Sequence, residues 1–310
     1  MSARTSLSLS IPILAAALAC AGCDDSLKSV WLIEETRVLG ARLEVEADPT
    51  RSSPSPGERA SLRLFVAAPN AEPRFSYELS VCAVHLANTG FPPCASAPFG
   101  TALETEPGNS AARLDFQVPG DIDLERTPHA FVSGMICPDS KLSLDTEGVA
   151  TCGANNGTEL AFEFALGGLE PSNRNPTFGA EAFSLDGEPW PASTELDCDA
   201  GSLPQVAARS RHVMRFDLAE SDFEPLTVQT SVDPDRETLL VSPFSSAGKL
   251  GNGFLALSAD TPLDQRQVTW DAPAFADAVP HLVRFYFVVR DPRSGEDFAQ
   301  RALCVAPRGP

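Results

Sequence analysis

Ala41-Arg42-Leu43-Glu44-Val45-Glu46-Ala47 is a stretch in which apolar residues alternate with charged ones. Successive side chains of a β-strand point to opposite faces of the sheet, so this pattern predicts a strand with one buried and one solvent-facing side. Similar alternation recurs along the chain, at residues 60–66, 75–81, 112–118, 160–166, 212–218 and 283–289. The sequence after the N-terminal segment has no comparable helical stripe, so these strands dominate the prediction.

Clusters of turn-forming residues separate the predicted strands. Examples are Ser53-Pro54-Ser55-Pro56-Gly57, Pro107-Gly108-Asn109 and Asp233-Pro234-Asp235. Short strands divided by such turns are typical of β-sandwiches. We therefore expect an all-β fold of two tandem antiparallel β-sandwich domains of the immunoglobulin-like kind. The remaining length is assigned to long loops at residues 84–110, 138–157 and 187–210.

Length and charge limit the classes of function. The chain has 310 residues, with 23 Lys+Arg against 42 Asp+Glu and a formal net charge of −19. Such a length suggests two domains, and so acidic a surface repels phosphate backbones, which argues against a nucleic-acid partner. The segment Gly167–Pro176 is rich in Gly, Pro and Asn, so we place the boundary there and expect domains at 38–170 and 171–310.

The amino terminus has the features of an export signal. Arg4 precedes the apolar run Leu7–Leu18, which has the length of a signal-peptide core and is too short to span a membrane. Small residues directly before a cysteine, as in Ala21-Gly22-Cys23, resemble the lipobox of bacterial lipoproteins. That resemblance implies cleavage after residue 22, acylation of Cys23 with palmitate-type chains, and a tether at residues 23–37.

Cys20 is an alternative acylation site, because Ala17-Leu18-Ala19 also precedes it with small or apolar residues. We favour Cys23, since it leaves an even number of cysteines downstream. The acyl chains would hold the protein on a membrane almost permanently, since each buried CH₂ contributes about 0.8 kcal/mol.

The six remaining cysteines predict disulfide bonds, because an exported chain folds under oxidising conditions. Six cysteines can pair in many ways, and the sequence alone does not choose among them. Proximity favours Cys82–Cys94 and Cys137–Cys152, which leaves Cys198–Cys304. No close pair of cysteines suited to zinc occurs after residue 23, so we expect no zinc site.

One group of carboxylates is a candidate calcium site. Asp233, Asp235 and Glu237 alternate along a turn, and Asp291 could join them from a neighbouring hairpin. Ca²⁺ prefers six to eight such hard oxygen ligands, although the EF-hand spacing is missing. The simpler interpretation is a solvated turn, and we expect no other cofactor.

Motifs of nucleophilic catalysis are absent from the sequence or incomplete. Ser246-Ala247-Gly248-Lys249 matches the S-x-x-K pattern of penicillin-binding enzymes but lacks the companion motifs, so it is interpreted as a turn. No G-x-S-x-G, H-E-x-x-H or P-loop pattern occurs. These observations predict a protein that is not an enzyme.

Three segments of the C-terminal half form a recognisable pattern, namely Ala247-Gly248-Lys249-Leu250, Trp270-Asp271-Ala272-Pro273 and the hairpin Val283–Gly295. With these segments, the C-terminal half resembles the immunoglobulin-like, PKD- or cadherin-like domains of secreted bacterial proteins. Together with the lipobox, the chain is similar to uncharacterised myxobacterial-type surface lipoproteins. That resemblance implies a β-sandwich fold and no particular activity.

The expected function is that of a non-enzymatic structural or protein-interaction module. It would be anchored on the bacterial cell envelope, at the outer membrane on its periplasmic or surface side, with an envelope or extracellular protein as partner. One alternative is an adhesin or carbohydrate-binding protein that uses aromatic residues around Phe91, Phe99 or Trp190. A second alternative is an envelope hydrolase with coupled carboxylates in a cleft.

Overall fold

The computed structural model describes most of the chain from residue 29 onward. The described ranges are 29–69, 72–84, 94, 97–108, 111–153, 157–167, 172–193, 197–199, 201–226, 236–277 and 279–307. Within them the chain forms β-strands, turns and the short 3-10 helices η2 (Glu220–Asp222) and η3 (Leu263–Gln265), which confirms the all-β prediction. No helix in these ranges is long and apolar enough to cross a bilayer.

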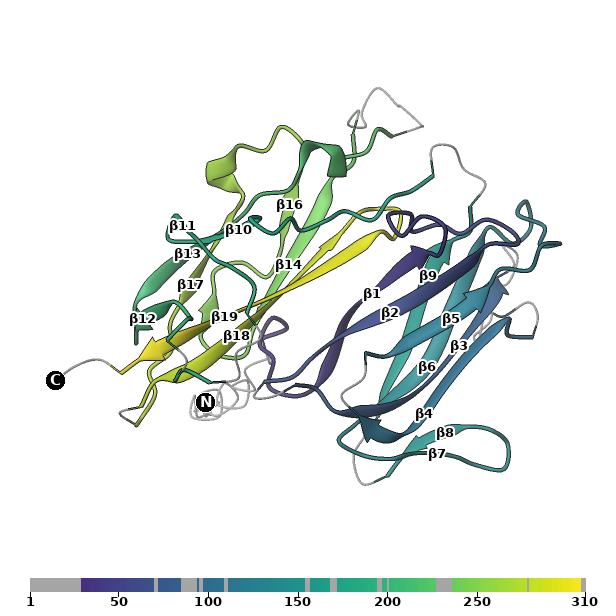
Figure 1. Ribbon diagram of the computed structural model, residues 1–310, viewed down its shortest axis with the longest axis horizontal. Helices are drawn as coiled ribbons and strands as arrows, with labels where there is room; N and C mark the ends of the chain where they lie inside the picture. Colours follow the sequence, from purple (N-terminus) through teal and green to yellow (C-terminus); the bar gives the residue numbers. More distant parts are fainter. Residues whose placement is uncertain are drawn as a thin grey trace, which may run out of the picture. The chain divides into compact units, whose positions relative to one another are not determined.

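Two sheets and a hairpin make up the first sandwich, drawn in purple to teal in Figure 1. One sheet has the strand order β1-β2-β5, the other has the order β4-β3-β6-β9, and β7 pairs with β8 alone. All of these pairs are antiparallel. The strands are β1 (Arg37–Val45), β2 (Arg59–Ala67), β3 (Phe75–Val84), β4 (Gly100–Gly108), β5 (Arg113–Gln117), β6 (His129–Pro138), β7 (Leu142–Leu144), β8 (Ala150–Cys152) and β9 (Thr158–Ala165).

Two five-stranded sheets make up the second sandwich, drawn in green to yellow. Their strand orders are β11-β10-β13-β17-β15 and β12-β19-β18-β14-β16. The pairing is antiparallel except for a short parallel contact between β12 and β19. The strands are β10 (Phe183–Leu185), β11 (Glu188–Pro189), β12 (Gln205–Ala207), β13 (Arg211–Phe216), β14 (Leu239–Ser245), β15 (Lys249–Leu250), β16 (Leu255–Leu257), β17 (Gln267–Asp271), β18 (His281–Arg290) and β19 (Glu296–Ala306).

Each sandwich has its own hydrophobic core between its sheets. The first core contains Leu43, Leu114 and Phe164, which come from strands with the predicted alternation. The second core is richer in aromatic rings, with Trp190, Trp270 and the residues Phe285 and Phe287 of β18 among those that solvent does not reach. Because aromatic side chains bury large apolar areas, the second core contributes strongly to the stability of its sandwich.

The expected long loops contain strands that the pattern did not indicate. Strand β4 lies within residues 84–110, the β7–β8 hairpin lies within 138–157, and β11 and β12 lie within 187–210. The interpretation of these ranges as loops is therefore wrong in part. Strand β4 is an edge strand that is mostly exposed, so its residues do not need the alternation that a buried face imposes.

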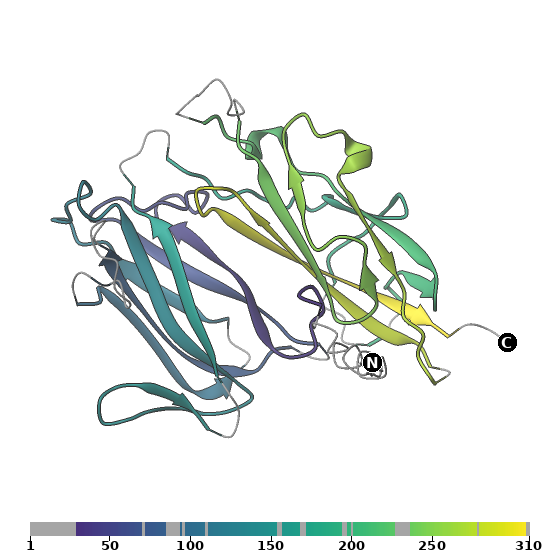
Figure 2. The ribbon, with the colours of Figure 1, turned by 180° about the vertical axis from the view of Figure 1, so that it is seen from behind.

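Strand β18 also differs from its prediction as a half-buried strand. Phe285 and Phe287 face the second core, whereas Tyr286 and Val288 belong to a separate cluster with Ile33, Leu39 and Ala67. Seven consecutive residues, Val283–Val289, are therefore buried. Figure 2 shows β18 and β19 as long neighbouring strands.

Candidate functional site

The described part of the chain contains three disulfide bonds, which join Cys82 to Cys94, Cys137 to Cys152 and Cys198 to Cys304. These are the pairs that proximity favoured. The first two lie in the first sandwich, and the third connects the 197–199 segment to β19. Disulfide bonds persist in oxidising compartments, so they suit an extracytoplasmic protein.

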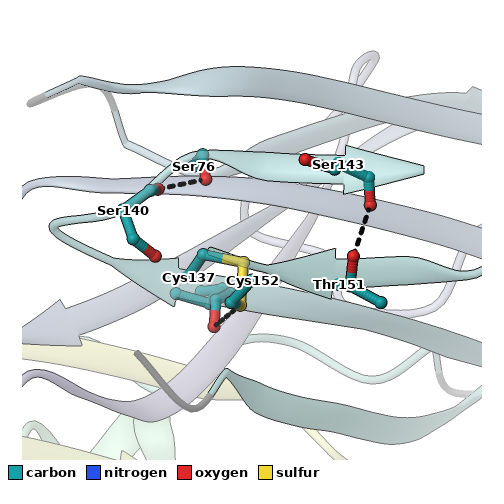
Figure 3. The surroundings of a disulfide bond; sticks show 7 residues. Ser76, Cys137, Ser140, Ser143, Thr151 and Cys152 are labelled. Carbon is teal, nitrogen blue, oxygen red and sulfur yellow. Dashed lines mark hydrogen bonds between the residues drawn. A yellow bond between two sulfur atoms is a disulfide. The ribbon is translucent and has the colours of Figure 1, made fainter. Parts of the chain in front are cut away.

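The Cys137–Cys152 bond fastens the β7–β8 hairpin to the central strand β6. Figure 3 shows the two sulfur atoms joined at the base of the hairpin. Ser76 of β3 donates a hydrogen bond to the carbonyl oxygen of Ser140 at 2.7 Å, and Thr151 donates one to that of Ser143 at 3.3 Å. The Thr151 bond joins β7 to β8 within the hairpin, which forms a two-stranded sheet of its own, whereas the Ser76 bond and the disulfide hold it against the sandwich.

Two of the four calcium candidates lie in a buried charged cluster, which we define as Glu224, Glu237, Asp291 and Arg293. Glu237 is 1% exposed, and Arg293 Nε donates to its Oε1 at 2.5 Å. The same guanidinium also donates to Glu224 through Nη2. Burial is the largest influence on Glu237 and raises its pKa, while the bond to Arg293 lowers it. Arg293 therefore supplies positive charge next to the carboxylate assigned to calcium.

Asp291 is bound by donors of its own protein. Its Oδ1 accepts hydrogen bonds from the backbone N–H of Arg293 at 2.7 Å and of Gly295 at 2.8 Å, and its Oδ2 accepts one from Asn173 at 3.1 Å. Burial nevertheless raises the pKa of Asp291 to about 7. The described residues contain no group of three or more His, Cys, Asp or Glu side chains arranged to hold a metal ion. Asp233 and Asp235 lie outside the described residues, so the four-residue calcium site stays a prediction.

Polar contacts join the first sandwich to the second near this cluster. Arg42 Nη1 of β1 donates to Asp297 Oδ1 of β19 at 2.8 Å, and the backbone N–H of Ala41 donates to Glu296 Oε2 at 2.8 Å. Asn175 donates to the carbonyl oxygen of Leu43 at 2.7 Å. The charged face of β1, predicted to face solvent, is thus partly buried, and Arg42 is only 9% exposed.

Aromatic contacts reinforce this junction. Phe65 of β2 stacks on Phe298 of β19 with the ring centroids 4.8 Å apart, and it also meets the edge of Tyr286 at 5.8 Å. The Tyr286 hydroxyl donates to the carbonyl oxygen of Ala68 at 2.6 Å. The junction therefore combines buried apolar surface with directional hydrogen bonds.

The structure also assembles a serine, a histidine and an aspartate that no sequence motif indicated. Ser210 Oγ lies 2.5 Å from His212 Nε2, and His212 Nδ1 lies 2.6 Å from Asp186 Oδ2. This order of groups is the one that nucleophilic catalysis uses. However, Ser210 Oγ also lies 2.5 Å from the carbonyl oxygen of Ala207, to which only the hydroxyl can donate. The single hydroxyl proton therefore has two competing acceptors, one of which belongs to a turn.

The structure describes two of the three aromatic residues considered for carbohydrate binding. Trp190 is 1% exposed and donates through Nε1 to the carbonyl oxygen of Ala302 at 3.0 Å, so the interpretation of Trp190 as an exposed aromatic is wrong. Phe99 is half-buried against Phe116, and Phe91 lies outside the described residues. Gly248 in the Ser246–Lys249 segment has φ of +85°, as the turn interpretation requires.

The candidate acylation residues Cys20 and Cys23 lie outside the described part of the chain. The first described segment pairs with the second sandwich. The N–H of Ile33 donates to the carbonyl oxygen of Ser245 at 2.9 Å, and the N–H of Ser245 donates to that of Trp31 at 3.0 Å. The chain then passes into β1 of the first sandwich.

No protein-family model matches the sequence, and no curated protein matches it. Among solved structures, the chain is similar to the D00-D0 domain of intimin, with 9% identity and a TM-score of 0.24 over 86% of this chain and 99% of that one. It is also similar to cadherin domains 1–4 of protocadherin gamma B7, with 11% identity and a TM-score of 0.19 over 86% of this chain and 49% of that one. A third similarity is to the collagen adhesin of S. aureus, with 9% identity and a TM-score of 0.13 over 87% and 92% of the two chains. Similarities with such low TM-scores carry no argument about function.

Proposed function

We propose that this chain is a non-enzymatic structural or protein-interaction module, held on the bacterial cell envelope by an acylated Cys23. The observation that carries the proposal is that the charged residues of the candidate site make their contacts within the protein itself. Glu237, Asp291 and Arg293 bond to one another or to neighbouring backbone. Three disulfide bonds and two hydrophobic cores support a role as a durable scaffold outside the cytoplasm.

Acylation is tested by labelling cells with a radioactive fatty acid and separating membrane from soluble fractions. Cys23→Ala is expected to abolish both labelling and membrane retention. The matched control is Cys20→Ala, which removes the alternative cysteine and is expected to change neither. If Cys20→Ala abolishes labelling instead, the anchor is at residue 20. If both variants remain labelled and membrane-bound, the acylated tether is refuted.

The interaction role is tested by chemical crosslinking in intact cells followed by mass spectrometry. We expect crosslinks from exposed loop residues of the sandwiches to an envelope or extracellular protein, because the loops of such sandwiches commonly make the contacts. Crosslinks confined to the chain itself would contradict a role in protein interaction.

A hydrolase is the second candidate, because Ser210, His212 and Asp186 lie in the order that acyl transfer uses. Its test is a fluorophosphonate probe, which reacts with activated serines. Trp190 does not support the adhesin or carbohydrate-binding alternative, because its side chain is enclosed in the second core.

A further inference from the structure

A pocket with a volume of about 670 Å³ lies beside β19 of the second sandwich. Its walls come from β18, β19 and the segments Phe178–Ala180 and Pro191–Ser193, and Glu72 and Pro73 also line it. Pockets of about 300–1,000 Å³ are typical of small-molecule sites. The pocket is therefore large enough for a ligand of several carbon atoms.

Arg284 of β18 is the notable charged residue of this pocket. The residue is 3% exposed, and its Nη2 is buried with no hydrogen-bond partner among the residues that the structure describes. Its backbone N–H donates to Ser246 Oγ at 3.0 Å, but in the described part of the chain no carboxylate forms an ion pair with its guanidinium. A buried charge without a partner is costly, so an anion in the pocket would be stabilised there.

Arg301 lines the same pocket but has its own partners. Its Nε donates to the carbonyl oxygen of Trp190 at 2.8 Å, and its Nη1 donates to that of Gln300 at 2.7 Å. The guanidinium carbon lies 4.1 Å from the centroid of the Phe183 ring. Arg301 is thus engaged in the packing of the second sandwich, whereas the guanidinium of Arg284 has capacity for a ligand.

The chemistry of the pocket walls limits the class of ligand that the pocket can bind. A guanidinium presents a planar fork that matches a carboxylate, and a single fork compensates a single negative charge. The net charge of −19 disfavours multiply charged anions near the protein. Phe178, Phe298 and Pro191 provide apolar walls, and the Tyr286 hydroxyl is already bonded to Ala68. These features favour a monoanion with an apolar body.

We propose that this pocket binds a monocarboxylate with an apolar body, held through the guanidinium of Arg284. This inference goes beyond the proposed function, because it is argued from the pocket and its residues alone. Its test uses purified protein, so a failure to bind carboxylates is distinguishable from a failure of the anchor, which is measured in cells.

The probe is N-acetylphenylalanine, titrated calorimetrically into the purified protein at neutral pH. The matched compound is N-acetylphenylalanine amide, which has the same body without the charge. We expect saturable binding of the acid, with the amide at least about tenfold weaker, because hydrogen bonds to charged groups are the strong ones. Glucuronate, a carboxylate with a polar body, is expected to bind more weakly than N-acetylphenylalanine.

Arg284→Gln is expected to weaken binding of the acid by about tenfold or more and to leave binding of the amide unchanged. Arg211→Gln is the matched control, since it makes the same charge change at an exposed arginine of the second sandwich, and it should bind normally. Ala192→Trp fills the pocket from an exposed segment without entering a core, and it should abolish binding while thermal unfolding stays unchanged.

Four results would overturn the proposal, and the first three concern relative affinities. They are equal binding of the acid and the amide, undiminished binding by Arg284→Gln, and tighter binding of glucuronate than of N-acetylphenylalanine. The absence of saturable binding by the acid would do the same.

Discussion

Asp291 has a carboxyl group whose protonation is coupled to folding. Burial raises its pKa from 3.8 to about 7, so between these values the folded protein holds a proton that the unfolded chain has released. The resulting stabilisation is full below about pH 4 and is lost as the pH rises through 7. We predict that Asp291→Asn, which is neutral at every pH, removes this component, which is on the order of a few kcal/mol.

Urea unfolding at several pH values between about 5 and 8 measures the effect. The matched control is Asp115→Asn, an equal charge change at an exposed position of β5, which should keep the pH dependence of the wild-type protein. A variant at Asp291 whose stability still falls with rising pH as steeply as that of the wild type would contradict the assignment.

Ser210 gives the second prediction at the scale of a residue. Because its hydroxyl is bonded to the carbonyl oxygen of Ala207 in a turn, we expect it not to act as a nucleophile. Fluorophosphonate should leave the protein unlabelled, and Ser210→Ala should lower the free energy of unfolding by about 1 kcal/mol. Labelling that disappears in both Ser210→Ala and His212→Gln would instead establish an activated serine.

No sequence pattern could have revealed this group. Ser210 directly precedes β13 and His212 lies within it, but Asp186 is in a turn before β11, and it reaches His212 because β10 pairs with β13. Such constellations are recognised by geometry rather than by position in the chain. The burial of Arg284 could not be predicted from the sequence either, because an arginine in an alternating strand is expected to face solvent.

At the scale of secondary structure elements, the alternating pattern predicts strands well where one face of the strand is exposed to solvent. Strand β5 alternates between exposed and buried residues along its whole length, as predicted. The prediction is wrong for β18, where the second face packs against residues of β1 and β2. The run Val283–Val289 is almost continuously apolar, and that is the signal of a strand buried on both faces.

The β7–β8 hairpin provides a prediction at this scale. The Cys137–Cys152 loop spans a separation of 15 residues, for which chain entropy gives about 3 kcal/mol. We predict that Cys137→Ser with Cys152→Ser speeds amide hydrogen exchange within the hairpin, because an isolated two-stranded sheet is marginally stable.

The matched control is Cys198→Ser with Cys304→Ser, which removes the bond with a separation of 106 residues. It is expected to lower the free energy of global unfolding by up to nearly 5 kcal/mol while exchange in β7 and β8 stays protected in the native state. If exchange in the hairpin is the same with and without Cys137–Cys152, the hydrogen bonds alone hold it and the prediction is wrong.

At the scale of the whole molecule, residues 31–310 form one compact unit although they contain two hydrophobic cores. The contacts at the junction explain this, since Phe65, Phe298 and Tyr286 lie between the cores and Arg42 pairs with Asp297 across them. The sequence predicted two sandwiches but not this junction, because it brings together residues far apart in the chain. A domain boundary at 170/171 stays a prediction.

We expect the junction to make the two sandwiches unfold together, and calorimetry can test that coupling. We predict a single thermal transition for the wild-type protein. Phe65→Ala removes the stacked ring at the junction, at a cost of about 1–3 kcal/mol, and is expected to split the transition into two. Phe99→Ala is the matched control, since it removes a half-buried ring that packs against the first core, and it should lower the melting temperature without splitting the transition. Two transitions in the wild type would mean that the junction does not couple the sandwiches. A single transition in Phe65→Ala would mean that the buried polar contacts of β1 with β19 couple the cores without the stacked ring.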